Sequence, residues 1–250
     1  MVSVTQYGLD DRAWSELERE VVDLFTSLLR VDTTNPPGNE TACALVLREY
    51  LSRNGIETTL IGELPERQNL TTQLDGTRPG PTLTLMGHLD VVPADAAEWS
   101  VPPFGGVVKD GYVWGCGTTD MKNQVAAEAV ALARLKRSGA EFAGTIKFAA
   151  TADEEDGEFC GVRWLCREHP ETLRCDYLLN EGMGGLWLPV GGRKVFLLAA
   201  GEKPSPSSAS ARAGAAGTPP CRRRSTARSS TWRAPSRRSG SPTRRRSSPQ

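Results

Sequence analysis

The feature that most constrains the fold of this chain is the alternation of helix-like and strand-like segments from its N-terminus to residue 179. Helix-like segments have apolar residues every three or four positions, and strand-like segments are short apolar runs rich in β-branched residues. The expected helices are residues 13–31, 40–54, 121–137 and 162–168. The expected strands are residues 57–61, 69–74, 81–86, 145–150 and 177–179. This alternation predicts a layered α/β domain with a largely parallel sheet.

The last 47 residues, 204–250, differ in composition from the rest of the chain, because 30 of them are Arg, Ser or Pro and none is Asp, Glu or Lys. Residues 1–203 carry 30 acidic and 19 basic side chains, so the neutral total hides a net charge of −11 in this part. The tail has one aromatic residue, Trp232, and no Leu, Ile, Val, Met or Phe. It cannot bury enough apolar surface to offset its ordering entropy. We therefore expect a folded part, 1–203, and a disordered tail, 204–250.

Composition also excludes several classes of protein. No apolar run approaches the ~18 residues of a membrane span, and the N-terminus lacks the pattern of a secretory signal. The six cysteines are scattered without a C-x-x-C pair, which argues against a disulfide framework or a zinc ribbon. A net charge near zero argues against an electrostatic nucleic-acid binder. The expected compartment is the cytoplasm, and the expected partner is a small molecule.

A histidine and several acidic residues follow the ends of expected strands, and one further acidic residue, Asp120, opens the helix expected at 121–137. Ligand sites of α/β sheets gather at the carboxyl ends of the strands, so these side chains are expected to lie close together. Mixed imidazole and carboxylate ligands suit zinc, with cobalt or manganese as substitutes. A carboxylate bridging two ions would give a two-metal hydrolase. The residues at this edge are His88, Asp90, Asp120, Asp153, Glu154, Glu155 and Glu181.

Each of these residues also has a simpler interpretation. His88 could be a hydrogen-bonded polar residue, and Glu154 with Glu155 could form an exposed acidic turn. Asp120 could be only a helix N-cap, and Glu181 could lie in a surface turn. Adjacent carboxylates repel unless a cation or solvent relieves them, and one of a pair can bind metal while the other acts as a base. Their joint occurrence at strand ends favours the metal site.

Residues 86–93 (MGHLDVVP) resemble the G-H-x-D-V-V-P signature of zinc-dependent exopeptidases and deacylases. This family includes aminoacylase, succinyl-diaminopimelate desuccinylase, acetylornithine deacetylase and glutamate carboxypeptidase. The resemblance extends from about Leu17 to Lys203. Further segments match the family in order: Trp99 with 102–105 (PPFG), 110–115 (DGYVWG), 117–122 (GTTDMK), 153–157 (DEEDG) and 180–182 (NEG).

The resemblance implies a fold, a reaction and a role for each matching residue. The implied fold is a three-layer α/β/α domain with a largely parallel mixed sheet, of which this chain holds the N-terminal portion. The implied reaction is hydrolysis of an amide next to a free carboxylate, in a peptide or an N-acyl amino acid, with water activated by two zinc ions. The implied roles are His88 and Glu181 on the first ion, Asp120 bridging both, Glu155 on the second, Asp90 orienting His88, and Glu154 as general base.

The chain departs from the family pattern in two small ways and one large way. Cys116 stands where Arg is usual and Asn123 where Gly is usual, although neither position is a metal ligand in the family. After Lys203 the family continues with a lid or dimerisation domain and a final metal-binding His, whereas residues 204–250 contain no His. His169 does not match and is expected at the surface near a helix end. We therefore expect a second metal site without its last ligand, no family homodimer contacts, and weak or no activity.

Two explanations of the tail stay open. One is a reading-frame change near Lys203, because the codons of residues 217–222, read from their third bases, permit His-Ala-Ser-Val-Pro. That sequence resembles the family's lid segment G-H-A-S-x-P. The other is a basic tail that binds RNA or a protein partner on a degenerate, non-enzymatic hydrolase domain. The presence of every expected ligand before the tail favours the hydrolase, and the match in the shifted frame favours the frame change.

Overall fold

The computed structural model describes residues 10–157, 159–181, 187–190, 193–196 and 231–233, and its centre is a five-stranded sheet in the order β1-β2-β6-β3-β7. The strands of this sheet are β1 (Thr59–Ile61), β2 (Asn69–Asp75), β3 (Arg78–His88), β6 (Ala143–Thr151) and β7 (Tyr177–Leu179). The helices are α1 (Asp11–Leu29), α2 (Glu40–Arg53), α3 (Lys122–Ser138), α4 (Val162–Glu168) and α5 (Pro170–Leu173), with a 3₁₀ turn, η2 (Ala96–Glu98). A three-stranded sheet contains β4 (Val107–Lys109), β5 (Tyr112–Trp114) and β10 (Thr231–Arg233). A two-stranded sheet pairs β8 (Trp187–Val190) with β9 (Arg193–Phe196).

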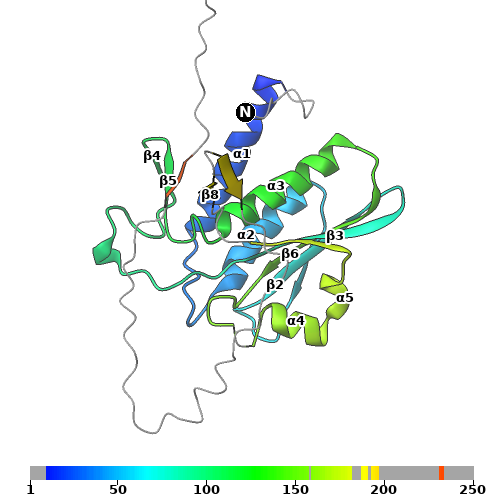
Figure 1. The fold of residues 1–250 in the computed structure, drawn as a ribbon. Helices are drawn as coiled ribbons and strands as arrows, with labels where there is room; N and C mark the ends of the chain where they lie inside the picture. Colours follow the sequence, from blue (N-terminus) through cyan, green and yellow to red (C-terminus); the bar gives the residue numbers. More distant parts are fainter. Residues whose placement is uncertain (1–9, 158, 182–186, 191–192, 197–230, 234–250) are drawn as a thin grey trace, which may run out of the picture.

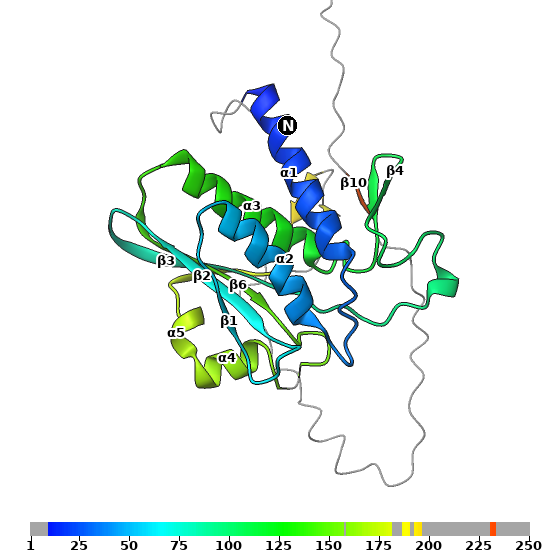
Figure 2. The same ribbon diagram turned by 180° about the vertical axis from the view of Figure 1, so that it is seen from behind.

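The large sheet is mixed and is covered on both faces. β6, β3 and β7 run parallel to one another, whereas β1 and β2 pair antiparallel with their neighbours. Helices α1, α2 and α3 lie on one side of the sheet, and the short helices α4 and α5 lie on the other (Figures 1 and 2). The three-layer α/β fold is therefore confirmed, with its parallel part in the three strands that precede the acidic residues.

The core lies between the sheet and the long helices. Helix α1 begins at the N-cap Asp10, whose carboxylate accepts a 2.7 Å hydrogen bond from the Ala13 amide, and it buries one apolar face. Alanines on α3 allow close approach to the sheet, where Phe148 of β6 is fully buried. Burial of such a side chain stabilises the fold by about 1.5–3 kcal/mol. Strand β3 is exposed at its beginning and buried at its carboxyl end, so the site edge of the sheet is anchored in the core.

The expected elements are all found, with shifts at their ends. The strand predicted at 81–86 extends to Arg78–His88, so that His88 is its last residue. The β4–β5 hairpin was not predicted, although Asp110 and Gly111 at its turn both have positive φ, as an Asp-Gly hairpin turn requires. No helix of the described residues is long and apolar enough to cross a membrane.

The expectation of a disordered tail concerns residues 204–250, which lie outside the described residues except for β10. This three-residue strand pairs antiparallel with β5. It is a strand that the composition did not predict. The boundary expected at residue 203 also lies outside the described part of the chain.

Candidate metal centre

The parallel strands bring the expected site residues to one edge of the sheet. β3 pairs with β6 in a register that sets His88 beside Thr151, so both strands end at the same edge of the sheet. Asp90 and the acidic pair Glu154–Glu155 follow these strand ends. β7 lies on the other side of β3 and leads to Glu181. Asp120 lies two residues before α3, whose N-cap is Met121 and whose first residue is Lys122. Four segments that are distant in sequence thus converge, as the strand-end pattern predicted.

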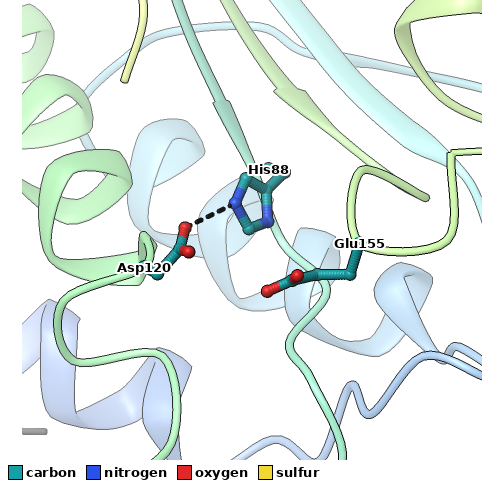
Figure 3. Close-up of side chains that lie close together, drawn as sticks. All are labelled: His88, Asp120 and Glu155. Atoms are coloured by element: carbon teal, nitrogen blue, oxygen red, sulfur yellow. Dashed lines mark hydrogen bonds and ion pairs between the residues drawn. The ribbon is translucent and has the colours of Figure 1, made fainter. Parts of the chain in front are cut away.

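The side chains at this edge converge on the imidazole of His88. The His88 Nε2 atom lies 2.9 Å from Asp120 Oδ1, 3.8 Å from Glu181 Oε2 and 3.9 Å from Glu154 Oε2. Figure 3 shows that the side chains of Asp120 and Glu155 come from two separate segments of the chain and lie near the imidazole. Two sets of ligand atoms each fall within 4.8 Å of one another: His88, Asp120 and Glu155, and His88, Glu154 and Glu181.

This donor set fits divalent cations. One imidazole faces carboxylates from three chain segments, and His88 is almost fully buried while the acidic groups are partly open to solvent. Burial and the neighbouring Asp120 raise the pKa of Glu155 to about 7. Burial also raises the pKa of Glu154, and the charge of His88 opposes this shift. Carboxyl groups crowded in this way are relieved by a bound cation, and imidazole with carboxylate oxygens is a ligand set of zinc.

The second nitrogen of His88 is held by Asp90. His88 Nδ1 lies 3.0 Å from the Asp90 carbonyl oxygen and 3.4 Å from Asp90 Oδ1, which leaves Nε2 facing the acidic groups. Burial would lower the pKa of His88, but hydrogen bonds with Asp120, Asp90 and Glu181 outweigh it and raise the pKa to about 12. The hydrogen bond with His88 also lowers the pKa of Asp120. The geometry is therefore compatible with the expected orienting role of Asp90, mainly through its backbone oxygen.

Asp90 has a further contact that the sequence did not suggest. Its fully buried carboxylate accepts hydrogen bonds from the amides of Glu154 (3.1 Å) and Glu155 (2.9 Å). Burial would raise the pKa of Asp90, but hydrogen bonds from His88, Asn35 and these amides lower it to about 2. Asp90 therefore connects the strand end of His88 to the backbone of the acidic pair.

Two other residues with candidate ligand atoms, Cys116 and His169, belong to neither ligand set among the described residues. Cys116 is buried, and its burial raises the pKa of the thiol to about 11. His169 directly follows α4, which agrees with its expected position near a helix end. The centroid of its ring lies 5.1 Å from the centroid of the Trp164 ring.

Lys122 is a buried residue whose structural contacts the sequence did not reveal. Its side chain is fully buried, and Nζ donates to the carbonyl oxygens of Leu28 (3.2 Å) and Val31 (2.9 Å) at the C-terminus of α1. A cation is favoured there because the carbonyls at a helix C-terminus carry partial negative charge. Lys122 thus fixes the first residue of α3, two positions after Asp120, to the end of α1.

Replacing Lys122 with methionine is expected to lower the free energy of unfolding by about 2 kcal/mol, because two carbonyls lose their charged donor. Urea unfolding followed by circular dichroism measures this change. Lys136, an exposed lysine on the same helix, provides the control, and Lys136→Met is expected to stay within about 0.5 kcal/mol of the parent. Equal effects of the two substitutions would contradict the anchoring role of Lys122.

Comparison with known proteins identifies the family. A family model described as peptidase family M20/M25/M40 matches residues 84–211, slightly more than half of the chain. The chain belongs to peptidase family M20/M25/M40. Membership confirms the resemblance carried by the sequence motifs and makes the chain an enzyme by family.

Individual M20 relatives agree with this membership. A succinyl-diaminopimelate desuccinylase of Methylobacterium nodulans is 41% identical over 163 residues, which are 62% of this chain and 40% of the relative. The enzyme of the same name from Psychrobacter arcticus is 34% identical over 154 residues, 58% of this chain and 37% of the relative. The solved M20 family metallo-carboxypeptidase of Sulfolobus solfataricus shares the fold, with a TM-score of 0.58 and 20% identity over 65% of this chain and 37% of its own. The chain therefore matches well under half the length of these relatives.

Proposed function

We propose that this chain carries the metal-binding part of a hydrolase that cleaves amide bonds in peptides or N-acyl amino acids. The observation that supports this proposal most strongly is that four carboxylates lie around the imidazole of His88, those of Asp120, Glu154, Glu155 and Glu181. The names of the M20 relatives support an N-succinyl amino acid as the first substrate class to test. The proposed compartment is the cytoplasm.

The proposed roles follow the motifs, and each residue concerned belongs to one of the two ligand sets around His88. His88 and Glu181 would hold a first zinc ion, Glu155 would hold a second, and Asp120 would be a ligand of both; cobalt or manganese could replace zinc. When bound, the ions supply Lewis-acid polarisation of a substrate carbonyl and activation of water. Glu154 is the proposed general base, which takes the proton from water and passes it to the leaving amine.

Turnover by this chain alone is expected to be weak. The part of the chain that matches M20 relatives corresponds to only 37–40% of their length, and the second ion lacks the histidine that the family motifs would supply. Metal binding is therefore the primary test of the proposed function, with release of free amine from N-succinyl amino acids as a second measurement.

The test is titration of the metal-free chain with Zn²⁺ by calorimetry. Because His88 supplies the only imidazole of either ligand set among the described residues, His88→Ala is expected to weaken binding of the first zinc ion by more than about 100-fold, beyond the ~10–100-fold typical of residues that only support a ligand. Glu155→Ala and Glu181→Ala are each expected to remove one binding event. Glu154→Gln is expected to keep the zinc affinity, because a base is not a ligand.

His169 is the control, since it is the only other histidine of the chain and lies outside both ligand sets. His169→Ala is expected to bind zinc like the parent. If the first zinc ion binds His88→Ala as tightly as the parent, or fails to bind His169→Ala, the proposed centre is rejected. Loss of zinc in Glu154→Gln would instead make Glu154 a ligand, as its place in the second ligand set permits.

A further inference from the structure

The loop that carries Glu154 and Glu155 is held by two carboxylates, one from another segment of the chain, Asp90, and one from the start of the loop itself, Asp153. Asp90 accepts from the amides of Glu154 and Glu155 at its beginning. Asp153 accepts from the amides of Phe159 (2.8 Å) and Cys160 (3.1 Å) at its end. Two buried carboxylates, one from each side, therefore fix the backbone that presents the acidic pair.

These two carboxylates are joined by one residue, Asn35. Its Nδ2 atom donates to Asp90 Oδ2 at 2.8 Å and to Asp153 Oδ1 at 3.0 Å. Asn35 is only 3% exposed and lies 55 and 118 residues away from its two partners in sequence. The Asn35 amide is thus the direct link between the residue behind His88 and the residue that starts the acidic loop.

The chemistry of the amide explains why asparagine occupies this position. A single amide nitrogen carries two hydrogens and no charge, so it can donate to two carboxylates at once. A serine has one such hydrogen, and an apolar side chain has none. The Oδ1 atom of Asn35 is buried and has no hydrogen-bond partner among the described residues. If the amide were rotated by 180°, Oδ1 would face the two carboxylates and repel them. The observed orientation leaves Oδ1 without a partner but lets the nitrogen donate to both carboxylates.

We propose that Asn35 is a positioning residue of the metal centre, which sets the distance between His88 and the Glu154–Glu155 pair by holding Asp90 to Asp153. The effect on metal binding rests on the proposed function, whereas the effect on the loop does not. Without the amide, two buried like charges lose their shared donor and separate. Because the backbone amides of Glu154 and Glu155 are hydrogen-bonded to Asp90, they move with it. The carboxylates of these two residues then shift away from their positions near His88.

The test compares Asn35→Leu, which has similar size and no donor, with Thr33→Val. Thr33 is a matched control, because it is also fully buried in the same loop and donates to the nearby Leu89 carbonyl (2.7 Å), yet contacts no carboxylate of the acidic loop. Asn35→Leu is expected to weaken Zn²⁺ binding ~10–100-fold, the range for residues that orient metal ligands, and to change the visible spectrum of the Co²⁺-loaded chain. Thr33→Val is expected to lower thermal stability while leaving both unchanged.

A second measurement does not need metal. Amide hydrogen exchange by NMR is expected to accelerate at Glu154, Glu155, Phe159 and Cys160 in Asn35→Leu, while Phe148 in β6 keeps its protection. If Asn35→Leu does not fold, Asn35→Ser, which retains one donor, is expected to lie between the parent and full loss in both measurements. Parent-like affinity and exchange in these variants, or equal changes in Thr33→Val, would overturn the proposal. A parent chain that binds no zinc would refute the metal centre, and the exchange measurement would still decide the role of Asn35 in the loop.

Discussion

Replacing Arg67 with methionine is expected to lower the free energy of unfolding by about 3–5 kcal/mol, the cost of leaving a buried charge without its partner. The Arg67 guanidinium forms a two-point contact with Glu40, with Nε–Oε2 and Nη2–Oε1 distances of 3.0 and 2.6 Å. It also donates to Asp153 at 3.1 Å. The Glu40 side chain is fully buried, and that of Asp153 is 2% exposed, so solvent cannot replace the lost cation.

The arrangement around Arg67 also explains why lysine is expected to be a poor substitute. Hydrogen bonds with Glu40 raise the pKa of Arg67, so the guanidinium stays charged. Its planar fork matches both oxygens of a carboxylate, which the single ammonium of lysine does not. We expect Arg67→Lys to retain part of the stability and Arg67→Met to lose it, as measured by urea unfolding.

Two further variants separate the buried pair from general effects of removing an arginine. Arg53 forms an exposed i,i+4 ion pair with Glu49 on α2, and such pairs contribute less than about 1 kcal/mol. Arg53→Met is therefore the matched control. Adding Glu40→Gln to Arg67→Met is expected to recover much of the loss, because it removes the uncompensated charge. A loss in Arg67→Met no larger than in Arg53→Met would show that the buried network is not a stabilising element.

The comparison of sequence and structure shows which parts of the fold local pattern can reveal. Apolar periodicity and β-branched runs depend on neighbours a few residues apart, and they located helices α1 to α4 and every strand of the large sheet, but not the short helix α5. The convergence of the acidic groups on His88 followed from one topological fact, that parallel strands end at the same edge. The Asp-Gly turn of the β4–β5 hairpin is also a local signal, because it is typical of a two-residue hairpin loop.

Other features depend on contacts that no local pattern contains. Asn35 meets Asp153 across 118 residues, and Arg67 meets it across 86. The position of β6 between β2 and β3 is likewise set by packing rather than by order in the chain. The contacts that hold the acidic loop in place were therefore missed, although the strand ends indicated which acidic residues lie near His88.

The second large effect is expected at Glu128, which lies on α3 and is 6% exposed. Its Oε1 accepts a 2.8 Å hydrogen bond from Gln124, whereas Oε2 is buried and has no hydrogen-bond partner among the described residues. Burial raises the pKa of Glu128 from 4.5 to about 7, and the hydrogen bond from Gln124 only partly opposes it. Glu128 is thus a buried acid without a cation, in contrast to Glu40.

A raised pKa gives this residue a definite effect on stability as pH changes. Between about pH 4.5 and pH 7 the folded state keeps the proton of Glu128 while the unfolded state loses it, so stability falls as pH rises through this window. Above about pH 7 the folded state also ionises, and the full cost of about 3 kcal/mol remains. Below about pH 4.5 both states are protonated and the cost vanishes.

Glu128→Gln is therefore expected to be more stable than the parent by up to about 3 kcal/mol at pH 8, with the difference disappearing near pH 4. The neutral amide resembles the protonated acid in shape and removes the buried charge. Urea unfolding of both proteins across this pH range measures the difference directly. The exposed Glu57 provides the control, and Glu57→Gln is expected to track the parent at every pH. A Glu128→Gln difference that stays constant between pH 4 and pH 8 would show that the substitution acts through packing and not through the charge of the carboxylate.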